Sequence, residues 1–158
     1  VKNTETLKQI ALYNCKIKAS VVEKDPKEQN LRRILNYGHT IGHAVESASS
    51  FELLHGQAVA IGIIAAVKIA EKMKIAKNVP DQLERITALL NKLKMPTKIP
   101  ANIKHDELIQ LLKRDKKAVA QWPRFVLIEE IGNTFCKNQQ WAHEVPKKIV
   151  EKTIDQMY

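Results

Sequence analysis

The chain has 158 residues, of which 44% are hydrophobic, 5% are aromatic and 27% are charged, and its formal net charge is +9 at pH 7. This length and apolar content suit one compact domain, and five glycines with six prolines are too few for a disordered or repeat-rich chain. The few aromatic rings and the scattered lysines disfavour a nucleic-acid-binding surface, whereas the net positive charge favours small anionic ligands.

Neither the cysteines nor the apolar segments indicate an extracellular or membrane protein. Cys15 and Cys136 form no CxxC pair, which is typical of unpaired thiols in a reducing compartment. The first residues carry charges and no signal-peptide core, and the longest apolar run, 58–67, is too short to span a bilayer. We therefore expect a cytoplasmic protein with no membrane and no nucleic acid as partner.

The first expected helix begins near Asn3 or Thr4, both good N-cap residues, and ends at Asp25-Pro26. Its apolar positions share one arc: Leu7, Ile10, Ala11, Ile17, Val21 and Val22. Lys18 lies near the middle of this arc, where a buried ammonium costs free energy unless an anion pairs with it. Two interpretations of Lys18 remain: its stem lines the core while its head reaches water, or it binds an anionic ligand.

A second helix is expected over residues 30–48, with an unusual polar stripe opposite its apolar face. The apolar face comprises Ile34, Tyr37, Ile41, Ala44, Val45 and Ala48, and the stripe comprises Arg32, Asn36, His39, His43 and Glu46. Gly38 and Gly42 lie beside the stripe, and each costs the helix about 1 kcal/mol relative to alanine. Their presence predicts a close approach of a neighbouring backbone or of a ligand.

A third helix is expected from His55 to about Lys74. Residues 58–67 are apolar nearly all round, which is typical of a central buried helix. His55 lies at the N-terminal end of this helix, where the helix dipole disfavours the imidazolium. The neutral ring is therefore available to a metal ion.

The later segments predict three further helices and a small hairpin. Helices are expected from Pro80 to about Met95, over residues 105–114, and from Pro146 onward. Residues 124–131 are expected to form a strand that turns at Gly132-Asn133 into a short partner at 134–137. The predicted fold class is therefore mainly α, a single helical domain over residues 1–158 with a small β-hairpin near its C-terminus.

Three histidines could supply metal ligands, because His39 and His43 are four residues apart on one helical face and His55 follows. Neutral imidazoles bind zinc, and a catalytic zinc ion usually has three protein ligands and one open position. Spacing alone pairs His39 with His43, and a solvated polar face without a metal explains the same pattern.

The segment LRRILNYGHTIGHAVE, followed by LHGQAVAIG, resembles the signature of the 3-dehydroquinate synthases and of the wider sugar-phosphate cyclase group. IKASVVEKDPKEQNLR before it, and DKK with RFVLIEEIG after it, resemble the same family in the same order, so the similarity covers about residues 10–132. The resemblance implies a lyase of the shikimate pathway, in aromatic amino acid biosynthesis, that converts 3-deoxy-D-arabino-heptulosonate 7-phosphate to 3-dehydroquinate and phosphate. It also implies NAD and a divalent metal ion, zinc first and cobalt second.

The same resemblance implies roles for individual residues. His39 and His55 match the family's two histidine metal ligands, whereas His43, Asn36 and Arg32 match residues that bind the substrate or handle its protons.

Three further positions complete this set. Lys18 matches a lysine that holds the carboxyl end of the substrate, and one of Lys116 and Lys117 matches a second anion-binding lysine. Glu46 is expected to serve as a partner that orients a histidine. Gln57 stands where the family usually has Glu.

Two features of the family are absent from this sequence: a dinucleotide-binding motif, and the glutamate before this region that serves as the third metal ligand. The chain is therefore expected to be the C-terminal half of a two-domain enzyme, inactive alone, whose Rossmann-like domain binds NAD and docks on it. The whole enzyme is expected to be a homodimer that acts on a phosphorylated sugar acid. Another sugar-phosphate cyclase, such as a 2-deoxy-scyllo-inosose synthase, and a non-catalytic helical module that binds a metal ion or a partner are the alternatives.

Overall fold

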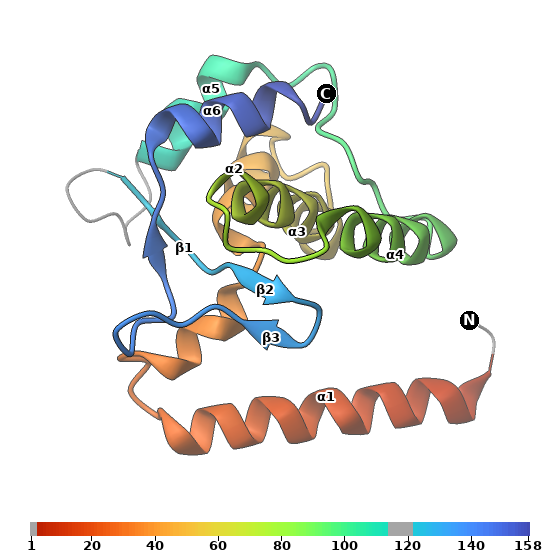
Figure 1. Cartoon of the computed structure of the whole chain (residues 1–158). Coiled ribbons are helices and arrows are strands. Elements are labelled where there is room, and N and C mark those ends of the chain that lie inside the picture. Colours follow the sequence, from red (N-terminus) through yellow and green to blue (C-terminus); the bar gives the residue numbers. More distant parts are fainter. Residues whose placement is uncertain (1–2, 114–121) are drawn as a thin grey trace.

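The computed structural model describes residues 3–113 and 122–158, and over these residues the chain is mainly helical, with short antiparallel strands near its C-terminus (Figure 1). The helices are α1 (Thr4–Lys24), the 3₁₀ helix η1 (Leu31–Asn36), α2 (His39–Ala48), α3 (His55–Lys72), α4 (Val79–Lys92), α5 (His105–Lys113) and α6 (Lys147–Asp155). The strands are β1 (Arg124–Phe125), β2 (Ile128–Glu130), β3 (Asn133–Thr134) and β4 (His143–Glu144). The predicted fold class is confirmed.

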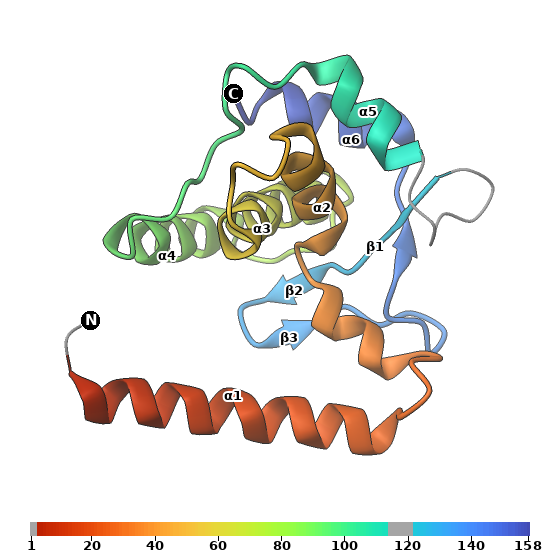
Figure 2. The ribbon, with the colours of Figure 1, turned by 180° about the vertical axis from the view of Figure 1, so that it is seen from behind.

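Helix α3 is the central helix, as its continuous apolar sequence predicted. Helices α2, α4 and α6 and strand β2 pack against it, and α5 packs against α2 (Figure 2). Ile61 and Ile69 of α3 are fully buried in the main core, together with Leu108 of α5 and Ile154 of α6. Each such side chain stabilises the fold by roughly 1.5–3 kcal/mol. Within the described part of the chain, no helix is both long and apolar enough to cross a lipid bilayer.

The strands form two small antiparallel pairs rather than one hairpin. Strand β2 pairs with β3 through the predicted turn, where Gly132 has a φ of +93°, and β1 pairs with β4, which the sequence did not predict. The single strand expected at 124–131 was therefore wrong. Residues 125–128 are all buried, so this segment lacks the in-and-out alternation of a strand with one solvent face and bends between the two pairs.

Helix α1 begins and ends where the sequence predicted, but it packs differently. The Asn3 side chain accepts hydrogen bonds from the backbone N–H groups of Glu5 and Thr6, and Asp25 is the C-cap residue. The helix lies along one side of the molecule, opposite α5 and α6 (Figures 1 and 2), and Val21 is its one buried residue. The expectation that its apolar arc faces the core was wrong for this chain.

The helix expected over 30–48 is two elements. The chain forms the 3₁₀ helix η1, breaks at Tyr37 and Gly38, and starts again as α2. Gly38 has a φ of +77°, in the left-handed region that favours glycine. Because of this break, Arg32 and Asn36 precede α2, and the expected continuous stripe was wrong. His39, His43 and Glu46 keep the predicted common face on α2.

Candidate metal centre

Three glycines bring α2 and α3 into close backbone contact. A Cβ atom on Gly62 of α3 would overlap the carbonyl oxygen of Gly38 and would lie 2.8 Å from the backbone nitrogen of Gly42. A Cβ atom on Gly42 would lie 3.1 Å from the Cα of Val59. The close approach that Gly38 and Gly42 predicted is therefore that of a neighbouring backbone. This close contact places the face of α2 that bears His39 and His43 near His55, the first residue of α3.

His39, His43 and His55 form a cluster whose potential ligand atoms all lie within 4.8 Å of one another. The ring centroids are 5.3 Å apart for His39 and His43, 5.3 Å for His39 and His55, and 5.7 Å for His43 and His55. His39 is half-buried, and His43 and His55 are exposed. Three imidazoles at this separation, with open access from one side, are a suitable donor set for zinc or cobalt.

Two hydrogen bonds indicate which ring nitrogen of His39 and of His55 carries the proton in the neutral imidazole. The Nδ1 atom of His39 lies 3.1 Å from the carbonyl oxygen of Tyr37, and the Nδ1 atom of His55 lies 3.2 Å from a carboxylate oxygen of Glu46. Carbonyl and carboxylate oxygens only accept, so each Nδ1 carries the proton and donates it. The Nε2 lone pair of each ring is then available to an ion. Glu46 thus makes the contact with a histidine that the sequence suggested.

The first turn of α3 holds His55 in place. The Gln57 side-chain oxygen accepts the backbone N–H of Leu54 at 2.9 Å, which satisfies an otherwise unpaired amide at the helix start. Gln57 therefore supplies a side-chain oxygen acceptor in the first turn, as a glutamate at this position also would. His55 remains the first residue of α3, as the sequence predicted.

A compact turn between α1 and η1 positions η1, the helix that carries Arg32 and Asn36. The buried carboxylate of Asp25 accepts backbone N–H groups from Gln29 at 2.9 Å, Asn30 at 2.7 Å and Arg32 at 2.9 Å. These bonds, that of Arg32 first, hold the pKa of Asp25 below its usual value. Asp25 thereby fixes the start of η1.

Two side-chain contacts also restrain this turn. The Arg32 guanidinium donates to the carbonyl oxygen of Pro26 at 3.0 Å, and the Asn36 amide donates to Glu28 at 3.3 Å. Sequence reasoning missed both Asp25 and Glu28 as parts of this region. The Asp-Pro pair that ended the helix was the available signal, because aspartate commonly accepts backbone amides in the turn that follows it.

Of the three predicted lysines, the structure describes Lys18. Lys18 is exposed on α1, so the interpretation that its stem is buried along the core was wrong for this chain, while its role as an anion ligand stays a prediction. Lys116 and Lys117 lie outside the described residues.

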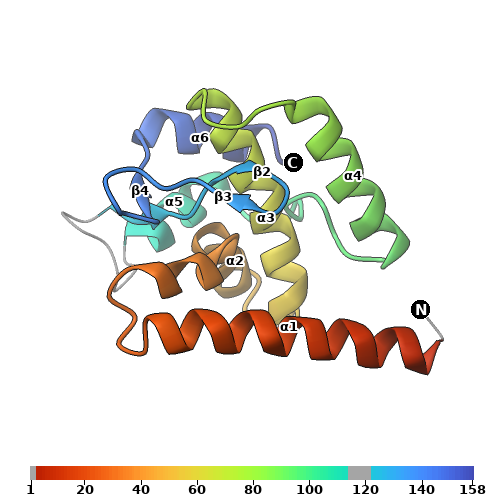
Figure 3. The ribbon, with the colours of Figure 1, turned by 60° about the horizontal axis from the view of Figure 1, so that its bottom comes forward.

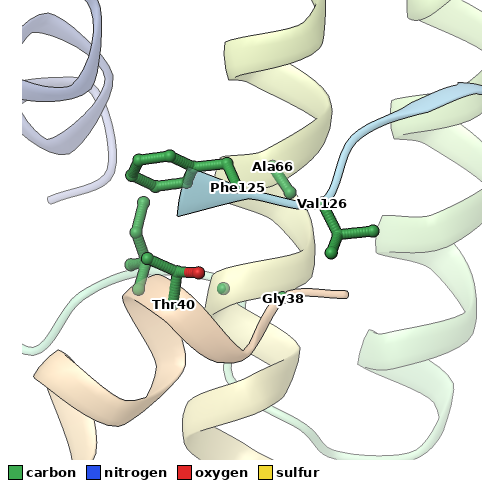
Figure 4. A pocket seen from close by; sticks show the side chains of 7 residues that line it. Gly38, Thr40, Ala66, Phe125 and Val126 are labelled. Atoms are coloured by element: carbon green, nitrogen blue, oxygen red, sulfur yellow. The ribbon is translucent and has the colours of Figure 1, made fainter. Parts of the chain in front are cut away.

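A small pocket lies beside the centre, between α2, α3 and β1 (Figure 4). It is lined by Gly38, Thr40, Ile41, Gly62, Ala66, Phe125 and Val126. None of the three clustered histidines is part of its lining. The Thr40 hydroxyl donates to the carbonyl oxygen of Arg124 at 3.1 Å, so this region ties β1 to the start of α2.

Comparison with known proteins identifies close relatives. The 3-dehydroquinate synthase C-terminal family matches residues 1–118. The chain is 42% identical over 154 residues to the 3-dehydroquinate synthase of Nostoc punctiforme, covering 97% of the chain and 40% of that protein. It is 41% identical over 155 residues to that of Thermosynechococcus vestitus, covering 98% of the chain and 40% of that protein. The chain thus spans about 40% of the length of these curated relatives.

Solved structures of sugar-phosphate cyclases share the fold. A 2-deoxy-scyllo-inosose synthase superimposes with a TM-score of 0.80 at 28% identity, over 100% of this chain and 42% of that one. A second structure of a 2-deoxy-scyllo-inosose synthase, complexed with carbaglucose-6-phosphate, NAD⁺ and Co²⁺, also gives a TM-score of 0.80, at 30% identity over 89% of this chain and 39% of that one.

Proposed function

This chain belongs to the 3-dehydroquinate synthase C-terminal family, and from that premise we propose that it is the metal- and substrate-binding domain of a 3-dehydroquinate synthase. The full-length enzyme would convert 3-deoxy-D-arabino-heptulosonate 7-phosphate to 3-dehydroquinate and phosphate. The observation that carries the proposal is the convergence of His39, His43 and His55 within 4.8 Å, with the Nε2 atoms of His39 and His55 left available.

The donor set fits the divalent ion that this function requires. In the proposal, His39 and His55 hold zinc or cobalt through Nε2, and a further ligand comes from the rest of the full-length protein. The bound ion supplies Lewis-acid polarisation of a substrate hydroxyl. NAD, which supplies the hydride chemistry, is bound by the N-terminal domain of the full-length protein. Tyr37 and Glu46 keep the two ligand rings in the required tautomer.

The remaining residues of the site bind and orient the substrate or move its protons. His43 is exposed beside the two ligands, where its ring can accept or return a proton at a substrate oxygen. The Arg32 guanidinium suits a phosphate or carboxylate, and the Asn36 amide suits a hydroxyl. Lys18 and one of Lys116 and Lys117 contribute further positive charge for this substrate, which carries both a carboxylate and a phosphate.

The decisive test replaces a proposed metal ligand in the full-length protein. His55→Ala is expected to lower phosphate release from the heptulosonate substrate by on the order of 100-fold or more, together with loss of bound metal. The matched control is His105→Ala, since His105 lies on α5 and outside the cluster. Unimpaired turnover in His55→Ala with normal turnover in the control would refute the metal assignment.

A second sugar-phosphate cyclase activity has support from the structural neighbours. Two structures of 2-deoxy-scyllo-inosose synthase share this fold with TM-scores of 0.80, and one of them holds a phosphorylated carbasugar. Lys18 favours a substrate that bears a carboxylate, which the heptulosonate has and glucose 6-phosphate lacks. Turnover of glucose 6-phosphate in preference to heptulosonate phosphate would transfer the assignment to this second activity.

A further inference from the structure

Helix α1 exposes an unusually apolar surface. Its large hydrophobic side chains Leu7, Ile10, Leu12, Tyr13 and Ile17 are 44–68% exposed. Among the helices and strands of the described residues, its principal packing partner is η1, next to it in the chain. Figure 3 shows α1 crossing one side of the molecule, with its N-terminal end reaching past the rest of the fold. A helix of this kind gains little from tertiary packing.

The exposed apolar residues are not spread evenly around α1. Leu7, Ile10 and Ile17 recur at intervals of three and seven residues, in line with the buried Val21, and so form one face. Leu12 lies about 160° around the helix from Ile10, among charged positions. In proteins, most of the stability of a helix comes from packing of its apolar face, and a continuous apolar face on a protein surface usually marks an interface. We therefore expect other polypeptide to bury the face of Leu7, Ile10 and Ile17.

The length of the relatives indicates what covers it. The relatives are much longer than this chain, which spans about 40% of them, and the family that matches is the C-terminal part of the synthase. Because the matching family is the C-terminal part of the synthase, we infer that additional polypeptide of the relatives lies on the N-terminal side of the segment that corresponds to this chain. Such a connection keeps a covering domain at high effective concentration beside this helix.

We propose that the α1 face of Leu7, Ile10 and Ile17 is the docking surface for the N-terminal part of the full-length polypeptide. This inference rests on the part of the proposed function that makes the chain one portion of a longer synthase, and not on the reaction itself. Lys18 follows Ile17 on the same arc, so docking also determines where its ammonium lies. The interface is intramolecular and apolar, and it holds α1 against a second domain.

Amide hydrogen exchange on the full-length protein tests the proposal. The backbone amides of α1 are expected to exchange slowly, because docking suppresses local opening. Their exchange rate should not depend on protein concentration. Ile10→Ser is expected to speed their exchange by roughly tenfold or more, the effect of losing about 1.4 kcal/mol of burial. Leu12→Ser is the matched control on the opposite side of the same helix, and serine costs the helix slightly more there. Exchange of the α3 amides shows whether the rest of the fold stays intact in each variant.

Each result decides the question. Unprotected α1 amides in the wild-type full-length protein overturn the proposal, and so does equal acceleration by the Ile10→Ser and Leu12→Ser variants. Protection that rises with concentration assigns the face to a second copy of the chain instead. If Ile10→Ser also unfolds α3, this variant is uninformative, and the proposal is tested by the exchange of the wild-type α1 amides and its dependence on protein concentration. A full-length protein that is inactive but protected at α1 refutes the proposed function and leaves the docking surface standing.

Discussion

His39 and His55 owe their suitability as ligands to the atoms behind them. A carbonyl oxygen in one case and a carboxylate in the other accepts the Nδ1 proton, which leaves the Nε2 lone pair of the neutral ring available to an ion. The Tyr37 carbonyl is backbone and cannot be removed by substitution. Glu46 contacts His55 through its side chain, so its contribution to the site can be tested by substitution.

We expect Glu46→Ala to weaken binding of Co²⁺ by about 10–100-fold, because His55 loses the acceptor that fixes its tautomer and orientation. The measurement is a Co²⁺ titration of the full-length protein, followed by visible absorption. Glu52→Ala is the control, since Glu52 is an exposed acid on the loop between α2 and α3. Equal affinities in the two variants would show that Glu46 has no part in metal binding.

Asp25 gives the turn before η1 a dependence on pH. Three backbone N–H donors, that of Arg32 first, lower its folded-state pKa below the usual value of 3.8. A depressed carboxyl pKa stabilises the folded state above the unfolded-state pKa, and this contribution disappears as the pH falls through the folded-state value.

Asp25→Asn is therefore expected to lower the free energy of unfolding at pH 7, and to approach the wild type as the pH falls below about 4. Denaturant unfolding of both proteins across this range measures the difference. Asp106→Asn is a suitable control, because Asp106 is exposed and accepts no backbone amide in the described structure. A constant difference between Asp25→Asn and the wild type at all pH values would contradict the explanation.

At the scale of elements, the crossing of α2 and α3 creates the site. The two helices approach so closely that Gly62 faces the backbone at Gly38 and Gly42 with no room for a Cβ atom. A side chain at this crossing would push α2 outward and carry His39 and His43 away from His55. The glycines are thus required for the packing of α2 on α3 and, with it, for the proposed metal centre.

Gly62→Ala is expected to destabilise the fold by about 2–3 kcal/mol, since its methyl group would overlap the rigid backbone of Gly38. Metal affinity should fall with it. Gly56→Ala offers a control within the same helix, because a Cβ atom there meets only the flexible end of Met95 at 3.8 Å, and alanine favours the helix by up to about 1 kcal/mol. Denaturant unfolding compares the two, and equal effects would show that the crossing tolerates a side chain.

At the scale of the whole molecule, the described chain holds part of a site and one uncovered face. The histidine cluster is open on the side of His43 and His55, and α1 exposes its apolar residues. Both features are explained if a second domain supplies the cover, a further metal ligand and the NAD site.

The isolated chain of 158 residues is therefore expected to bind Co²⁺ through its histidines but to release no phosphate from the heptulosonate substrate, even with NAD present. The Co²⁺ spectrum verifies that the centre has formed, and a phosphate assay on the same sample measures turnover. The full-length protein under the same conditions is the positive control. Turnover by the isolated chain would show that the centre needs no second domain.

The sequence alone determined the helical class, most helix boundaries and the family, because these depend on local periodicity, capping residues and one long motif. It also singled out His39, His43 and His55, which lie within that motif. It failed on the continuous helix at 30–48, on the orientation of the α1 arc and on the pairing of β1 with β4.

Only the tertiary structure decided these points, because each of them depends on contacts between elements. The break at Gly38 depends on how closely α3 approaches, and the burial of residues 125–128 depends on helices distant in the sequence. The sequence suggested Glu46 as a partner of a histidine, but only the structure identified that histidine as His55 and the Tyr37 carbonyl as the acceptor behind His39. Periodicity tells which residues share a face of one helix, whereas contacts between elements depend on long-range packing that no local pattern records.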